Sequence, residues 1–358
     1  MLWVDKYRPD AFERFAINQD IGKRLQGLAG SGDCPHVLLY GPPGAGKKTI
    51  VLSLLRELYG AGAKKVKVEH RPWKIELPSR KLELELTMVT SNYHVEMNPS
   101  DVGNNDRYVV QEIIKEMAKS RPVDPSGAKT FKVLVLNEVD RLSREAQHSL
   151  RRTMEKYSSA CRLVLICTNV SKVLDPLRSR CVCVRVPAPS LDEIQGVLQE
   201  VAKREQTTLP PPLAARIALA SERNLRKALL SLESCRVQAG TGALPENMDV
   251  QLADWELYIK TIATDIVSEQ SPKQVYTVRG KLYELLSNVI PPELIARRLV
   301  MELCRKIPDD ALKPVVVEAG ATFEHRMQGG SKPIFHLEAF VARVMSEYKK
   351  WAMDALGG

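Results

Sequence analysis

The stretch that decides the fold of this chain reads Gly41-Pro42-Pro43-Gly44-Ala45-Gly46-Lys47-Lys48-Thr49. It follows an apolar run at 37–40 and opens a helical pattern with apolar residues at 50, 54, 55 and 58. A glycine-rich loop between a strand and a helix is the arrangement in which backbone N–H groups curl around a phosphate. We therefore predict a phosphate-binding loop, or P-loop, in which the Lys47 side chain reaches the β- and γ-phosphates of a nucleotide.

The residue directly after that lysine departs from the usual motif. A Ser or Thr hydroxyl normally holds Mg²⁺ at this position, but here the residue is Lys48, and Thr49 comes one place later. A second departure comes directly after the strand expected at 132–136. The next two residues are Asn137-Glu138, where an Asp-Glu pair would organise the metal and activate water. Asn is neutral and attracts Mg²⁺ far less than Asp does.

The two departures are consistent with each other. They predict a site that grips ATP or ADP, holds Mg²⁺ weakly or not at all, and hydrolyses nucleotide poorly, with Glu138 idle. The alternative is that Thr49 and a shifted backbone restore a working site. Further along, an apolar run at 163–167 leads to Asn169, which either faces the γ-phosphate or caps a turn.

Length and composition are those of an ordinary globular protein. The 358 residues suffice for two or three domains, and 44% of them are hydrophobic and 27% charged. The net charge of +9 permits a polyanionic partner such as nucleic acid, although a solvated surface rich in lysine would give the same value. No apolar run approaches membrane length, so we expect no membrane partner. The cysteines are scattered, and Cys181-x-Cys183 has no second pair at zinc spacing, so we expect no metal cluster.

The pattern along the chain predicts three parts. Alternating strand-like and helix-like stretches at 1–186 predict an α/β domain, a parallel sheet with flanking helices. We expect strands at 37–40, 66–69, 87–91, 132–136, 162–167 and 182–186, and a half-exposed strand at 81–86 in a hairpin. Helical stretches at 191–205, 212–220 and 224–237 predict a small helical domain at 187–244, with a capping box at Ser190 and Glu193. The rest, 245–358, is expected to be all helical because its apolar residues fall on helix faces.

One helix, expected to end near Lys119, has an apolar face and a basic face. Arg107, Gln111, Lys115 and Lys119 follow one another at i, i+4 spacing and form a ridge suited to phosphates. A solvated helix face would show the same pattern. No element that would read bases is visible, so binding to DNA should not depend on its sequence.

These features together resemble an AAA+ ATPase, and further stretches resemble the small subunits of the replication factor C clamp loader. The stretches are Trp3-Val4-Asp5-Lys6-Tyr7-Arg8-Pro9, an N-terminal box that lies against adenine in this family, Leu150-Arg151-Arg152-Thr153-Met154-Glu155-Lys156-Tyr157, the helix after the Walker-B strand, and Ser179-Arg180-Cys181. The run at 224–229 resembles the sensor-2 helix, although the preceding acidic residue is absent. Within this family, the departures at Lys48 and Asn137 resemble the eukaryotic small subunit whose own ATP site is degenerate.

The resemblance implies roles for individual residues. It assigns nucleotide contacts to Val4, Tyr7, Arg8, Ala16, residues 41–49, Asn169 and Arg226, the last as the sensor. Arg180 would be an arginine finger presented in trans to a neighbouring subunit, because a guanidinium suits the charge that a γ-phosphate gains in the transition state. A surface ion pair is the alternative for Arg180. Arg107 and Lys115 would contact DNA phosphates.

The resemblance also implies an assembly and its activity. An AAA+ domain, a three-helix lid and an all-α collar would join other replication factor C subunits in a hetero-pentamer. The complex would use ATP to load the sliding clamp PCNA onto primer–template DNA in the nucleus, in replication and repair, and alternative large subunits would be further partners. This chain would hydrolyse little ATP itself and support hydrolysis in trans.

Two other functions remain open from the residues alone. The first is a free-standing P-loop ATPase or kinase, which the altered magnesium positions disfavour. The second is an AAA+ remodeler of polypeptides, which the lack of an obvious aromatic pore loop disfavours.

Overall fold

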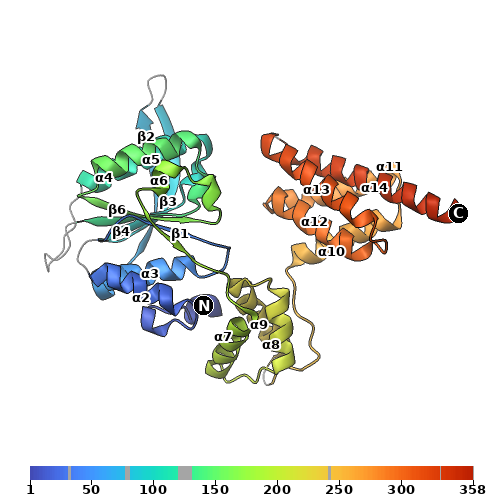
Figure 1. Cartoon of the computed structure of the whole chain (residues 1–358), viewed down its shortest axis with the longest axis horizontal. Coiled ribbons are helices and arrows are strands. Elements are labelled where there is room, and N and C mark those ends of the chain that lie inside the picture. Colours follow the sequence, from blue (N-terminus) through green and yellow to red (C-terminus); the bar gives the residue numbers. More distant parts are fainter. Residues whose placement is uncertain (31–33, 77–80, 120–130, 241–242, 331, 358) are drawn as a thin grey trace. The chain divides into compact units, whose positions relative to one another are not determined.

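The computed structural model describes residues 1–30, 34–76, 81–119, 131–240, 243–330 and 332–357. They form two compact units, Met1–Val250 and Gln251–Gly358, and each unit has hydrophobic cores of its own. Figure 1 shows the helices and strands of both units. Among the described residues, no helix is both long enough and apolar enough to cross a membrane.

The first unit is built on a seven-stranded sheet with the order β2-β3-β4-β5-β6-β1-β7. In chain order the strands are β1 Val37–Tyr40, β2 Lys67–Glu76, β3 Lys81–Thr90, β4 His94–Met97, β5 Lys132–Leu136, β6 Cys161–Cys167 and β7 Val182–Arg185. Five neighbouring strands of the sheet, β4, β5, β6, β1 and β7, pair in parallel, as expected for an α/β domain. β2 and β3 form an antiparallel hairpin that joins β4, so the sheet is mixed. The strands expected at 81–86 and 87–91 are thus one strand, and the sequence pattern did not predict β4.

Helices cover both faces of the sheet, which is why its central strands are continuous apolar runs. α2 (Gln19–Gly30) and α3 (Lys47–Tyr59) cover one face, and α4 (Asp106–Lys119) and α5 (Arg144–Lys156) cover the other (Figure 1). The short helices of this region are α1 Trp3–Lys6, η1 Phe12–Arg14, η2 Gly60–Lys64, η3 Pro99–Asn105, η4 Val139–Arg141, η5 Val170–Lys172 and α6 Asp175–Arg178. In such sheets, ligands bind beyond the carboxyl ends of the strands, and the P-loop leaves β1 at that end.

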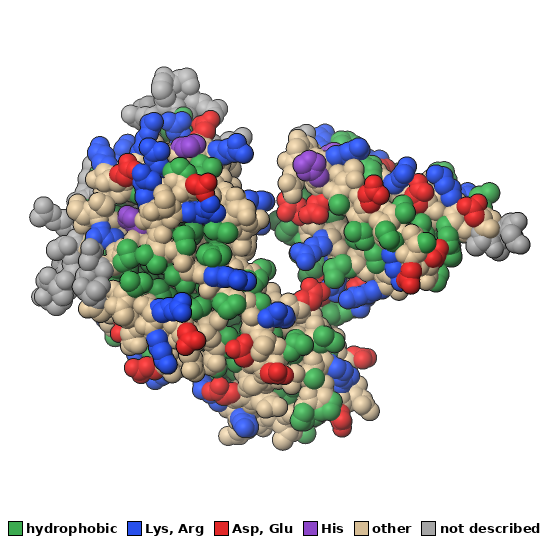
Figure 2. Space-filling model, viewed as in Figure 1, with side chains coloured by type: hydrophobic (Ala, Val, Ile, Leu, Met, Phe, Trp, Pro, Cys, Tyr) green, Lys and Arg blue, Asp and Glu red, His purple; other side chains and the backbone are tan. Residues whose placement is uncertain are grey.

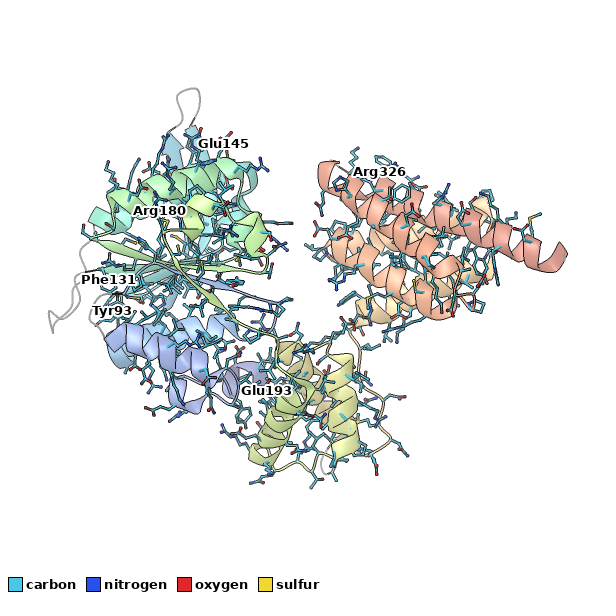
Figure 3. The ribbon with its side chains drawn as sticks, in the orientation of Figure 1. Tyr93, Phe131, Glu145, Arg180, Glu193 and Arg326 are labelled. Atoms are coloured by element: carbon cyan, nitrogen blue, oxygen red, sulfur yellow. The ribbon has the colours of Figure 1, made fainter. Side chains whose placement is uncertain are left out.

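Three helices follow the sheet within the first unit: α7 (Leu191–Arg204), α8 (Pro211–Ala220) and α9 (Leu225–Ala239). They share a core that contains Leu198, Ile217 and Leu232. α7 begins in the predicted capping box, because Ser190 Oγ accepts from Glu193 N at 3.1 Å and Glu193 Oε2 accepts from Ser190 N at 2.7 Å; Figure 3 labels Glu193. The boundaries predicted at 186 and 244 both fall within the first compact unit and stay predictions.

The second unit is helical, as predicted. Its helices are α10 Asp254–Ser268, α11 Pro272–Ser287, α12 Pro292–Lys306, α13 Leu312–Gly329 and α14 Pro333–Gly357. Ile262, Leu299 and Phe340 lie in its core. Buried charges accompany this core: Arg298 lies 3.8 Å from a carboxylate oxygen of Glu256 and 3.4 Å from one of Glu302.

Candidate nucleotide site

The P-loop begins where β1 leaves the sheet. Gly44 has a φ of +73°, and a Cβ there would lie 1.8 Å from Asn224 Oδ1, so only glycine fits between the loop and the start of α9. α3 begins at Lys47, and the N–H groups of its first turn have no partner within the helix. Lys47 Nζ donates to the carbonyl oxygens of Gly41 at 2.5 Å and Pro42 at 2.9 Å. Burial lowers the pKa of Lys47. The loop therefore brings an ammonium group and a helix N-terminus together, which is a site for phosphate.

The side chain at the usual metal position is tied to a neighbouring strand. Lys48 Nζ lies 2.6 Å from Glu96 Oε1 of β4, and Asn137 Nδ2 donates to the same oxygen at 2.9 Å. The Glu96 side chain is only 9% exposed. Mg²⁺ requires oxygen ligands in near-octahedral geometry, whereas this position presents an ammonium and an amide N–H group. These residues do not fit Mg²⁺, and Lys48 supplies a positive charge there instead.

The loop after β5 contains two acidic residues with different surroundings. Glu138 has left-handed backbone angles, φ 53° and ψ 43°, and its carboxylate pairs with Arg141 at 3.1 Å. Asp140 Oδ2 accepts from Thr168 N at 3.1 Å, Thr168 Oγ1 at 2.6 Å and Asn169 N at 2.9 Å. Burial acts to raise the pKa of Asp140, but these hydrogen bonds outweigh it and hold the pKa below its usual value. Asp140 therefore joins the ends of β5 and β6 beside the P-loop.

The N-terminal segment contacts both the sheet and the helices α7 to α9. Phe12 packs in the core that includes α3, whereas Val4 and Tyr7 pack against the core of α7 to α9. Tyr7 Oη donates to Glu205 Oε1 at 2.5 Å, and Lys6 Nζ lies 2.5 Å from the same oxygen. The segment thus forms a wall that connects the two halves of the first unit.

A pocket of about 790 Å³ lies among these elements. Of the predicted nucleotide and metal positions, its lining includes Val4, Tyr7, Arg8, Ala16, Pro43, Gly44, Ala45, Gly46, Lys47, Lys48, Thr49, Asn137, Glu138 and Arg226. It also includes residues that sequence reasoning did not indicate, such as Ile17, Asn18 and Val201. Its volume lies within the range of roughly 300–1,000 Å³ that is typical of small-molecule sites. Apolar walls and a basic loop fit a nucleotide, whose base is flat and whose phosphates are anionic.

The other predicted nucleotide residues lie outside this lining. Asn169 Oδ1 accepts from Ser171 N at 2.9 Å and caps η5, so the turn-capping alternative describes its position. The pocket is lined instead by Thr168, one residue earlier. Gly41 and Pro42 take part through their carbonyl oxygens, which accept from Lys47.

Arg180 lies in the loop between α6 and β7 and is labelled in Figure 3. Its Nε and Nη2 atoms lie 2.7 Å and 2.5 Å from Glu155 Oε1 of α5. It is not among the described residues that line its own chain's pocket. With 36% of its side chain exposed, it is accessible from outside this chain.

The ridge expected on α4 is present in part. Arg107 and Lys115 are 42% and 44% exposed, and they pair with Glu145 at 3.4 Å and Glu112 at 2.5 Å. Figure 2 shows Lys and Arg side chains over the region of α4 and α5 in this view, and Figure 3 labels Glu145 on α5.

Gln111 does not belong to this ridge. Its Nε2 donates to Ser149 Oγ of α5 at 2.5 Å, so the side chain lies in the contact between α4 and α5. The expectation that Gln111 continues the basic face is therefore wrong, because the α5 helix covers that position. The Lys119 side chain lies outside the described residues.

Sequence reasoning gave no role to three acidic residues of this region, Glu96, Asp140 and Glu155. Asp140 could have been found, because it ends the motif that begins at Asn137. Glu96 pairs with Lys48, and Glu155 pairs with Arg180. These partners are distant in the sequence, so no local sequence pattern predicts the contacts.

Comparisons with known proteins agree with this architecture. Three family models match: "Replication factor C subunit 3, C-terminal domain" at 255–352, "RCF1/5-like, AAA+ ATPase lid domain" at 196–237 and "DNA polymerase III, delta subunit" at 17–190. The chain is 56% identical to replication factor C subunit 3 of Arabidopsis thaliana over 100% of both chains. It is 50% identical to the human replication factor C subunit 3, over 100% of this chain and 99% of the human one.

A solved structure agrees at the level of the fold. The RuvB Holliday junction branch migration motor of Thermotoga maritima has a TM-score of 0.50 and 17% identity, covering 78% of this chain and 87% of that chain. At this identity the likeness concerns the fold alone.

The fold and the P-loop pocket define an AAA+ P-loop protein with a helical lid formed by α7 to α9. Within that class, the chain belongs to the family of replication factor C small subunits, the clamp-loader family. The predicted AAA+ fold, lid and helical C-terminal domain are confirmed.

Proposed function

We propose that this chain is a nucleotide-binding but weakly hydrolysing subunit of a replication factor C hetero-pentamer, which loads the PCNA sliding clamp onto primer–template DNA. The observation that carries the proposal is the contact of Lys48 and Asn137 with Glu96. With these residues the metal position lacks the hydroxyl and carboxylate ligands on which metal-assisted phosphoryl transfer depends. The rest of the pocket is in place. Family membership supports the other subunits as partners.

The nucleotide, ATP or ADP, binds in the pocket without a tightly held Mg²⁺. Lys47 and the first turn of α3 contact the phosphates, Lys48 adds charge beside them, and Tyr7 borders the base. Arg226 reaches the pocket from α9. Glu138 stays idle as a base, because its carboxylate pairs with Arg141.

Arg180 acts on the nucleotide of a neighbouring subunit. A guanidinium is always charged and matches a phosphate in geometry. Arg180 is outside its own pocket and partly exposed, which suits action in trans.

Arg107 and Lys115 bind DNA phosphates by exchanging their carboxylate partners for phosphate oxygens. We place the assembly in the nucleus, because the relatives come from plants and animals, whose replicating DNA lies there. A tagged chain that imaging finds outside the nucleus would contradict this placement.

The test changes this subunit alone in the assembled complex and measures ATP turnover. Lys47→Ala should leave most of the turnover in place, because other subunits supply it. Arg180→Ala should lower the turnover of one other site by a factor of order 10³ and leave binding in this chain's pocket unchanged. Arg178→Ala is the matched control, because Arg178 pairs with Asp175 in the same segment.

Two outcomes would overturn the proposal. If Lys47→Ala removes most of the turnover while the other sites stay loaded, this pocket is an active one, as a free-standing ATPase or the Thr49 alternative requires. If Arg180→Ala keeps full turnover, Arg180 is a surface ion-pair residue and not a finger.

A further inference from the structure

The guanidinium of Arg180 is held from two sides. Its Nε and Nη2 atoms contact Glu155 Oε1 at 2.7 Å and 2.5 Å, while Nη1 donates to Pro176 O at 2.8 Å and lies 3.4 Å from Ser179 Oγ. A surface arginine that pairs only with a carboxylate of its own helix, as Arg178 pairs with Asp175, has no such long-range anchor. Arg180 is therefore fixed in direction.

The helix that carries the Glu155 carboxylate is packed into the sheet domain. Glu155 lies near the end of α5, and the same turn of the helix contains Thr153 and Met154, which are 8% and 3% exposed. Leu150, one turn earlier, is fully buried in the same core as the strands β5 and β6. Glu155 thus ties Arg180 to the packed body of the sheet domain, in addition to the contacts that Arg180 makes with its own segment.

The contacts also leave Arg180 able to bind an anion. Its hydrogen bonds within the described part of the chain come from Nε and Nη1, whereas Nη2, which has two N–H groups, contacts only the Glu155 carboxylate as an ion pair. The side chain is 36% exposed. An arginine with a purely structural role would be covered by neighbouring residues. The Arg180 guanidinium is held in one orientation and is still accessible to solvent.

We infer that Glu155 is a positioning residue for Arg180: its carboxylate orients the guanidinium so that the exposed N–H edge meets a phosphate of the neighbouring subunit. This inference rests on the proposed role of Arg180 in trans. Orienting a donor before the reaction avoids the loss that a misplaced group causes, and such misplacement can lower a rate by about 10²-fold. Glu155 does not touch the nucleotide and acts only through Arg180.

The experiment is a double-mutant cycle in the assembled complex. Four complexes carry the unchanged chain, Glu155→Gln, Arg180→Ala or both changes, and ATP turnover is measured at several ATP concentrations. The part of the turnover that Arg180→Ala removes defines the receiving site. Glu155→Gln keeps the size and an acceptor oxygen but removes the charge. It should lower the kcat of that part by roughly tenfold with little change in KM, and should change nothing further in the Arg180→Ala background.

Controls separate positioning from folding. Asp175→Asn removes a neighbouring ion pair and should leave turnover unchanged, since Asp175 pairs with Arg178 and not with Arg180. Glu155→Asp retains the charge on a shorter side chain and should recover part of the loss. Thermal unfolding and assembly of each variant are measured alongside.

The outcomes distinguish this inference from the function on which it rests. If Arg180→Ala lowers turnover and Glu155→Gln does not, Arg180 is a finger that needs no such anchor, and only the inference is wrong. If Glu155→Gln lowers turnover equally with and without Arg180, the role of Glu155 is structural. If Arg180→Ala has no effect, the proposed function and the inference both fail.

Discussion

The metal position of the pocket is altered by three residues that act together: Lys48, Glu96 and Asn137. One oxygen, Glu96 Oε1, receives both the ammonium at 2.6 Å and the amide N–H at 2.9 Å. Removing one partner of a buried carboxylate leaves charge that is less well compensated. Magnesium binding would therefore return in full only when Lys48 and Asn137 change together, because each occupies the Glu96 oxygen with an N–H donor.

We predict that the double variant K48T/N137D makes nucleotide binding depend on magnesium. It supplies the hydroxyl and the carboxylate that organise Mg²⁺ in ordinary P-loop sites, and it frees Glu96 to accept hydrogen bonds from water on the ion. The isolated chain suffices for the measurement, since the pocket lies within the first unit. In ATP titrations the double variant should bind at least about tenfold more tightly with Mg²⁺ than with a chelator, a difference of about 1.4 kcal/mol.

The unchanged chain is the reference for this prediction. Its ATP affinity should be nearly the same with and without Mg²⁺, because the Lys48 ammonium already stands near the metal position. K48T and N137D alone should each give a smaller response than the double variant. A strong magnesium dependence in the unchanged chain would mean that Lys48 does not replace the ion's charge.

At this scale, the sequence predicts residues whose role follows from neighbours in the chain. The P-loop, Lys48 and Asn137 belong to motifs with fixed spacing, and Ser190 with Glu193 forms the expected capping box. Glu96 and Glu155 could not be predicted in this way, because their partners approach only when the sheet has formed. For Asn169 the sequence left two positions open, one facing the γ-phosphate and one capping a turn, and only the structure shows the cap.

At the scale of elements, strands that are covered on both faces were predicted best. The bounds of β1 and β5 match the prediction, since each is a short apolar run between polar segments. β4 was missed because His94 and Glu96 interrupt its apolar residues. Both residues are buried, at 1% and 7% exposure of the whole residue, which the alternation of apolar and polar residues does not indicate.

Burial of His94 in β4 makes the free energy of unfolding depend on pH. Burial lowers the pKa of His94 below its ordinary value of 6.5, and the nearby Glu96 carboxylate offsets this only in part. The unfolded chain therefore takes up the proton at a higher pH than the folded chain does. As a result, the free energy of unfolding falls as the pH drops through 6.5, and it stops falling below the lower pKa of the folded state.

We predict that H94Q, which has no titrating ring, weakens this dependence. Denaturant unfolding of the first unit, measured between about pH 5 and pH 8, should show a smaller loss of stability on acidification than the unchanged chain shows. His94 Nδ1 lies 2.8 Å from Ser91 Oγ, so S91A serves as a control that removes this contact and keeps the ring. Equal pH dependence in H94Q and the unchanged chain would exclude His94 as the source.

At the scale of the whole molecule, the two compact units differ in what they contribute. None of the hydrophobic cores among the described residues draws on both Met1–Val250 and Gln251–Gly358. The nucleotide pocket, Arg180 and the basic residues of α4 all belong to the first unit. The net charge of +9 is a property of the entire chain, and a general attraction to DNA must be separated from contacts made by a defined ridge.

Charge reversal at two positions of α4 distinguishes contacts of this ridge from a general attraction to DNA. R107E/K115E in this subunit of the assembled complex should weaken binding to primed DNA, and the slope of log K against log salt should become shallower by about 2, since each phosphate contact to duplex DNA contributes about 0.9. K273E/K349E changes two exposed residues of α11 and α14 and is the matched control. Each reversal removes two charge units, so both double variants carry +5 instead of +9. If the control weakens binding as much as the ridge variant does, the attraction is one of total charge. A loss confined to R107E/K115E instead assigns the phosphate contacts to α4, because both variants carry the same net charge and differ only in where the reversed residues lie.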